Sequence, residues 1–201
     1  VIELLSNFDI SDAAKAAFYL VFLPVAGLLL WGAALRARTE EQNRRHRLWL
    51  IQLLRVYFLV LLGVIAEFIY SAVGFEDLDR IRMLLLDTTS GLAWTSMLIL
   101  AAVGLFVLGR VRTIDAIWLI AVIVIKTQIG HAAGADDRII ASMMSGLHLL
   151  AASLWVGGLL MIVILWRRHR YEAEQLLPTV SGASLAAVIV LVLSGLISSA
   201  L

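Results

Sequence analysis

The stretch LWLIQLLRVYFLVLLGVIAEFIYSAV, residues 48–73, decides the fold class of this chain. It is an almost unbroken apolar run in which only Arg55 and Glu67 carry charge. A run of this length exceeds the roughly 20 apolar residues that a helix needs to cross the hydrocarbon layer of a membrane. Because backbone polar groups inside a bilayer must be satisfied within the protein, the run predicts a transmembrane helix.

The rest of the chain repeats this pattern. Hydrophobic residues make up 62% of the 201 positions and charged residues only 15%, which is too little polar surface to cover a soluble protein. We therefore predict one integral membrane domain, 1–201, that is an all-α bundle embedded in a lipid bilayer. Its six expected spans lie near residues 15–35, 48–73, 90–108, 114–133, 139–166 and 179–201.

The start of the last span and the two ends of the chain bear on where the spans begin and how many there are. Pro178 directly precedes the sixth span, where the start of a helix tolerates proline. The chain opens at Val1 without an initiator methionine and ends at Leu201 within an apolar stretch, so we take six spans as a minimum.

Basic residues gather in alternate connectors, which predicts an orientation. Ten of the 16 lysines and arginines fall between spans one and two, three and four, or five and six: Arg36, Arg38, Arg44, Arg45, Arg47, Arg110, Arg112, Arg167, Arg168 and Arg170. Basic residues in short loops favour the cytoplasmic side, so both termini are expected outside. Nine of the 15 acidic residues lie on the opposite side, in the N-terminal segment and the other connectors: Glu3, Asp9, Asp12, Glu76, Asp77, Asp79, Asp87, Asp136 and Asp137. They form either plain solvated loops or a rim that concentrates cations.

Ionisable side chains inside a membrane are costly and mark candidate functional positions. In this chain they are Arg55, Glu67, Lys126, His131 and His148. With the helix rise as a ruler, His131, Glu67, Met144, Met97 and His148 lie roughly 5–15 Å below the outer surface. Four different spans would thus bring potential metal ligands into one outer layer.

The chemistry of these ligands favours copper. Met144 and His148 are four residues apart and share one helix face. The chain has no cysteine, so soft ligation falls to methionine, which favours Cu(I), while imidazole accepts Cu(I) or Cu(II). The alternative is that His148 only hydrogen-bonds a neighbouring helix and that the methionines fill gaps in packing.

Two further sets of residues carry less specific signals. Lys126 is expected near mid-membrane, either neutral, or paired with an acid, or as a fixed charge that limits cation passage. Small residues in the last two spans, such as Gly157 and Ser194, would let helices approach closely.

Several segments resemble the copper resistance protein D family. They are GHAA at 130–133, LHLLAASLWVGGLL at 147–160 and TTSGLAW at 88–94, with a weaker match from Val180 to Leu196. The resemblance covers roughly the second half of the chain, and the segment from His148 to Gly158 is its most specific part. The family usually has about eight spans, so this chain would be a reduced relative or lack two of them.

The resemblance implies a bacterial inner-membrane protein that accepts copper from the periplasm, often beside a small periplasmic copper-binding protein, and moves it inward. His131 and His148 then become the expected copper contacts.

Two other functions stay open. Two histidines could ligate a b-type haem, although their estimated depths differ by about 9 Å. A structural scaffold would use its polar groups only to join helices. We expect no enzyme activity and no nucleic-acid partner, because the chain has neither a glycine-rich phosphate motif nor a readable Ser/His/Asp arrangement.

Overall fold

A computed structural model describes residues 10–35, 40–129, 138–168 and 170–200. Throughout these ranges the chain forms helices joined by turns, with no strand, so the predicted all-α class is confirmed. The helices are α2 (Ile10–Leu35), α3 (Glu40–Ala72), α4 (Leu78–Asp87), α5 (Thr89–Val107), α6 (Arg112–Thr127), α7 (Arg138–Arg168) and α8 (Arg170–Ala200).

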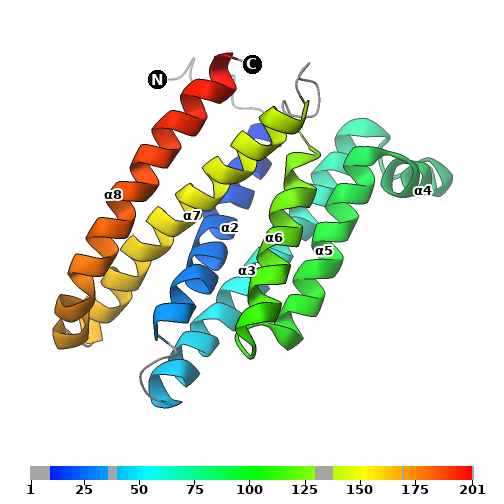
Figure 1. Ribbon diagram of the computed structural model, residues 1–201. Helices are drawn as coiled ribbons and strands as arrows, with labels where there is room; N and C mark the ends of the chain where they lie inside the picture. Colours follow the sequence, from blue (N-terminus) through cyan, green and yellow to red (C-terminus); the bar gives the residue numbers. More distant parts are fainter. Residues whose placement is uncertain (1–9, 36–39, 130–137, 169, 201) are drawn as a thin grey trace, which may run out of the picture.

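Five of these helices, α2, α3, α5, α7 and α8, are long and apolar enough to cross a membrane. The fourth predicted span corresponds to α6, which has 16 residues and is therefore about 24 Å long. This is shorter than the roughly 30 Å of a hydrocarbon core. The chain is accordingly a multi-pass membrane protein in which α6 is a shorter helix beside α5 and α7 (Figure 1).

The successive helices α2, α3, α5, α6, α7 and α8 alternate in direction (Figure 1), and α2 packs against α3, α6 and α7. The start of α2 and the end of α8 lie at one end of the bundle, shown uppermost in Figure 1. The ends of α2, α5 and α7 and the starts of α3, α6 and α8 lie at the opposite end. The basic residues described near these helix ends therefore share one end of the bundle, as the sequence predicts.

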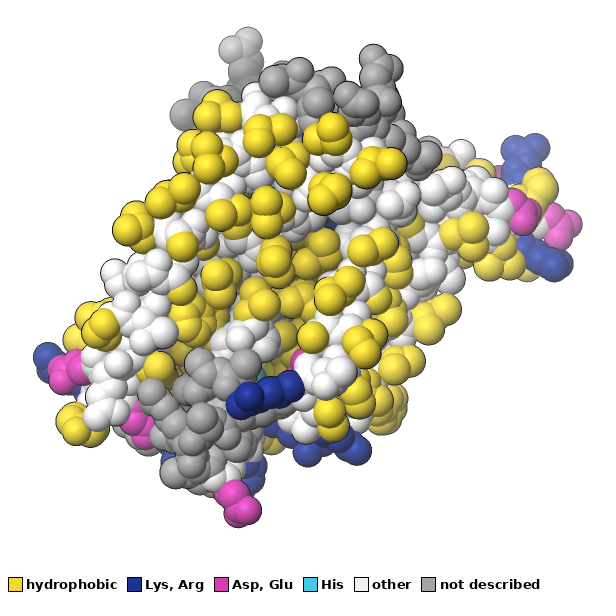
Figure 2. Space-filling model, viewed as in Figure 1, with side chains coloured by type: hydrophobic (Ala, Val, Ile, Leu, Met, Phe, Trp, Pro, Cys, Tyr) yellow, Lys and Arg dark blue, Asp and Glu magenta, His cyan; other side chains and the backbone are white. Residues whose placement is uncertain are grey.

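The outer surface has the character of a lipid-facing surface. Figure 2 shows hydrophobic side chains over most of the visible face, with charged side chains gathered near the lower end and on α4. Exposed residues on the long helices include Leu59, Phe106, Leu159 and Leu185. Because these side chains would be unfavourable in water, their exposure matches a surface that lies in lipid.

Helices α2 and α7 cross at two glycines. A Cβ atom added at Gly27 would overlap the backbone of Gly157, and one added at Gly157 would overlap the backbone of Gly27. Close by, the indole Nε1 of Trp31 donates a 2.9 Å hydrogen bond to the carbonyl oxygen of Leu154. The prediction that Gly157 allows a close helix approach is confirmed, since small residues let membrane helices meet backbone to backbone.

One element, α4, was not predicted from the sequence. Asp77 caps its start, because its carboxylate accepts hydrogen bonds from the backbone N–H groups of Asp79 at 3.0 Å and Arg80 at 3.1 Å. Its residues are all exposed or half-buried, and Leu78 is 79% exposed. This short helix therefore lies beside the bundle against α5 rather than inside it (Figure 1).

The expectation that Pro178 marks the start of the last span is wrong. Helix α8 begins at Arg170, so Pro178 lies inside it. Ala173, Leu176 and Val180 are buried at helical spacing around the proline. Their packing continues the helix through a position where proline removes one backbone hydrogen bond.

Candidate functional site

His148 lies where α7 faces α8. The imidazole Nδ1 is 3.1 Å from the hydroxyl oxygen of Ser194 on α8. A Cβ atom added at Gly195 would lie 3.7 Å from the imidazole Cε1, so the ring is in ordinary van der Waals reach of α8 at this position. The His148 side chain is exposed, whereas Ser194 is 1% exposed.

The hydroxyl of Ser194 lies within hydrogen-bond distance of two groups. Its oxygen is 3.2 Å from the carbonyl oxygen of Leu191, to which it can donate its single proton, and 3.1 Å from Nδ1 of His148. When the hydroxyl donates to Leu191, it accepts from His148, and the imidazole proton lies on Nδ1. The Nε2 atom then keeps its lone pair, and within the described ranges no residue bonds it. Metal-binding histidines are commonly held in this way, with one ring N–H bonded to the protein and the other nitrogen available.

Met144 lines a groove. The groove has a volume of about 1100 Å³ and lies between α2, α6 and α7. It extends from Asp115, near the start of α6, to Gln128 beyond its end. Most of its lining is apolar, and Met144, Thr127 and Gln128 add polarisable or polar atoms.

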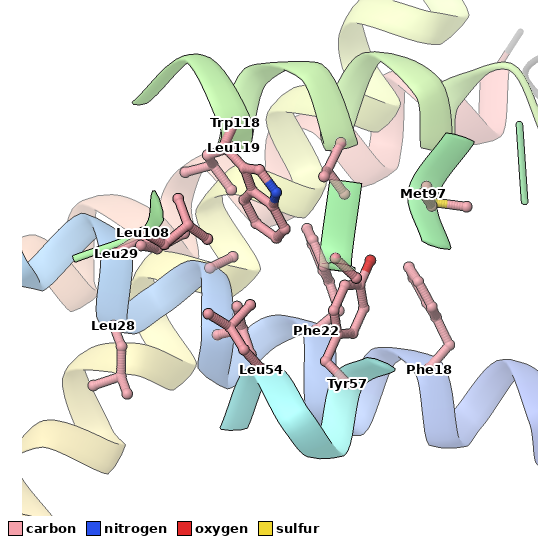
Figure 3. Close-up of a cluster of buried hydrophobic side chains, with 14 of the residues drawn as sticks. Phe18, Phe22, Leu28, Leu29, Leu54, Tyr57, Met97, Leu108, Trp118 and Leu119 are labelled. Atoms are coloured by element: carbon pink, nitrogen blue, oxygen red, sulfur yellow. The ribbon is translucent and has the colours of Figure 1, made fainter. Parts of the chain in front are cut away.

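Met97 has a different environment. Its side chain is 0% exposed, within the hydrophobic core formed with Phe18, Phe22 and Tyr57 (Figure 3). An ion could reach this sulfur only if the surrounding rings moved. Glu67, the other predicted ligand in this half of the bundle, lies half-buried in the last turns of α3.

The predicted shared metal layer is therefore only partly visible. Among the residues that the structure describes, no three His, Asp or Glu side chains come together as a metal cluster. His131 lies outside the described residues, so its part in such a site stays a prediction. The described candidates occupy four places: His148 the face between α7 and α8, Met144 the groove, Met97 the core, and Glu67 the last turns of α3.

The two cationic side chains inside the spans also differ. Arg55 is exposed on α3, and its Nη1 donates to Gln52 on the same helix at 3.5 Å. Lys126, in the last turn of α6, points toward aromatic rings of α2 and α5, with its Nζ 5.5 to 5.8 Å from three ring centroids.

The segment TTSGLAW at 88–94 has a structural role. The Thr88 hydroxyl donates to the carbonyl of Leu84 at 2.6 Å and accepts from the N–H of Gly91 at 3.0 Å, so it ends α4 and caps α5. A Cβ atom at Gly91 would overlap the backbone of Leu84. Trp94 is 8% exposed in the core. The spacing Thr-x-x-Gly-x-x-Trp thus joins α4 to α5 and orients the indole.

Sequence reasoning did not find the role of Ser194. It identified this residue only as a small residue for helix packing, because nothing in the sequence pairs a serine on one span with a histidine 46 residues earlier. The signal that could have found it is the spacing of Ser194 and Gly195, which puts a hydroxyl and a gap side by side on α8.

Comparison with known proteins gives one informative likeness. No family model matches the chain, and no solved structure matches it. A curated relative, the copper transport protein CutJ of Bacillus subtilis (strain 168), is 30% identical over 134 residues, which cover 59% of this chain. The aligned part amounts to 25% of the relative's length. The chain is therefore similar, over part of its length, to about a quarter of a copper transport protein.

Proposed function

We propose that this protein carries copper across the plasma membrane of a bacterium, and that the Nε2 atom of His148 is one of the atoms that contact the ion. The observation that carries the proposal is the contact between Nδ1 of His148 and the Ser194 hydroxyl, which leaves Nε2 available, in a chain similar in sequence to part of a copper transport protein. An unprotonated imidazole nitrogen is a good ligand for Cu(I) and Cu(II).

The position of His148 suits an entry site. His148 lies in the first half of α7, which is the half nearer the end of the bundle where α2 starts and α8 ends. By the positive-inside rule this end faces outward, so copper would enter from the periplasmic side, where a small copper-binding protein could deliver it. Met144, one turn closer to the outer surface, would offer a thioether to Cu(I) before the ion reaches the imidazole.

The test is copper uptake into liposomes that contain the purified full chain. We expect uptake of radioactive copper above that of empty liposomes, and a loss of more than about tenfold in His148→Ala, since a direct ligand contributes at least as much as its supporting partners. Leu159→Ala, which shortens an exposed side chain on the same helix, is the matched control and should transport like the parent.

Two results would overturn the proposal. One is uptake equal to that of empty liposomes at every copper concentration, together with no copper in the purified protein. The other is a Soret band that disappears in His148→Ala, which would assign the imidazole to a haem.

A further inference from the structure

The ammonium group of Lys126 lies within an aromatic cage. Its Nζ is 5.7 Å from the ring centroid of Phe18, 5.5 Å from that of Tyr19 and 5.8 Å from that of Trp94. The rings belong to α2 and α5, whereas the lysine belongs to α6. All three distances are within the roughly 6 Å at which a cation is attracted to the face of an aromatic ring.

The cage is held in shape by contacts among its own rings. Phe18 packs nearly perpendicular to Tyr19, with centroids 5.2 Å apart and an interplanar angle of 79°. It packs in the same way against Trp94, at 5.7 Å and 83°. Phe18 is 0% exposed and Trp94 is 8% exposed, whereas Tyr19 is 39% exposed. The cage therefore has a buried base and an open side at Tyr19.

The rings replace an acidic partner. In the described part of the chain, Lys126 makes these three ring contacts and no ion pair with a carboxylate. An ammonium ion removed from water needs compensating interactions, and the faces of several aromatic rings supply them without a counter-charge. The same arrangement of rings recognises alkylammonium groups in proteins that bind them as ligands.

We propose that Phe18, Tyr19 and Trp94 form a binding site for a small alkylammonium ion, and that the side chain of Lys126 is its built-in occupant. With the lysine in place, α6 is tied to α2 and α5 through a charge rather than through packing alone.

The site is tested by removing its occupant and supplying a substitute. Lys126→Ala deletes three methylene groups and the ammonium, which propylammonium replaces atom for atom. We expect the variant, as full chain in detergent micelles, to unfold at a lower temperature than the parent. Millimolar propylammonium should raise that temperature saturably in the variant and leave the parent unchanged. Neutral 1-propanol should have no such effect. Equal shifts in variant and parent, or equal shifts with propanol, would overturn the proposal.

A second experiment keeps the proposal testable if Lys126→Ala does not fold. Lys126→Met removes the charge at nearly constant length, and Tyr19→Leu removes the most exposed ring of the cage. If the ring holds the charge, Lys126→Met should lower the unfolding temperature less in the Tyr19→Leu background than in the parent. Lys126→Arg, which keeps a cation, should lower it least. Strictly additive shifts would contradict the cage. No copper is present in either experiment, so their outcomes are independent of the transport proposal.

Discussion

Lys126 and His148 both carry nitrogen atoms in their side chains and lie within helices of the bundle, but their surroundings differ. The ammonium of Lys126 contacts three aromatic rings, of which Phe18 and Trp94 belong to the packed core and Tyr19 is exposed. The imidazole of His148 is bonded at Nδ1 only, on an exposed face between α7 and α8. The Nζ atom of Lys126 therefore serves to hold helices together, whereas the Nε2 atom of His148 stays available as a ligand. A copper contact is therefore expected on the second side.

The largest loss of stability is expected from a substitution where α2, which carries two rings of the cage, crosses α7, which carries the imidazole. Gly157→Leu would force a side chain into the backbone of Gly27, because no flexible side chain is there to move aside. We expect a loss of about 3 kcal/mol or more in the free energy of unfolding, and loss of copper binding with it. The measurement is denaturation of the purified protein in mixed micelles.

Gly182→Ala is the matched control for this crossing. A Cβ atom at Gly182 would meet nothing within 4 Å, so the variant should be as stable as the parent or slightly more stable, since alanine favours helix. Equal stability of Gly157→Leu and Gly182→Ala would mean that the two regions are not joined at this crossing.

A smaller effect should separate the two methionines. Met144→Leu at the groove should weaken Cu(I) binding and leave Cu(II) binding unchanged, because a thioether favours Cu(I) and leucine nearly conserves volume. Met97→Leu in the core should change neither affinity and should cost less than about 1.5 kcal/mol in stability. Competition with a Cu(I) chelator measures both. Weakened Cu(I) binding in Met97→Leu alone would place the copper site in the core and reverse the contrast.

The sequence predicts the long helices well because their signal is local. Residues 48–73 and 139–166 are apolar over a membrane's thickness, and both form continuous helices. The short helix α4 is not predicted by this criterion. It is amphipathic and lies beside the bundle, so its sequence lacks the long apolar run that identifies a membrane span. The prediction for Pro178 was wrong because the helix before it is stabilised by the burial of Ala173 and Leu176, and this burial depends on tertiary contacts that a sequence pattern does not contain.

The candidate site was predictable only in its residue types. An imidazole within a span is visible in the sequence, and so is its spacing from Met144. The tautomer of His148 depends on where the proton of Ser194 goes, which is set by the carbonyl of Leu191 on another helix. Likewise, the cage around Lys126 combines rings from two helices distant in the chain. Such partners become evident only when the helices are in place.

The copper affinity of Ser194→Ala tests whether the Ser194 hydroxyl prepares His148 to bind copper. Removing this hydroxyl frees the imidazole proton to move to Nε2, while His148 itself stays in place. We expect a loss of copper affinity of roughly 10- to 100-fold, as is typical when the hydrogen-bond partner of a metal ligand is removed. Ser198→Ala, one turn along α8 at an exposed position, should bind copper like the parent. Equal affinities for the parent, Ser194→Ala and Ser198→Ala would contradict the claim that Ser194 prepares His148 for copper.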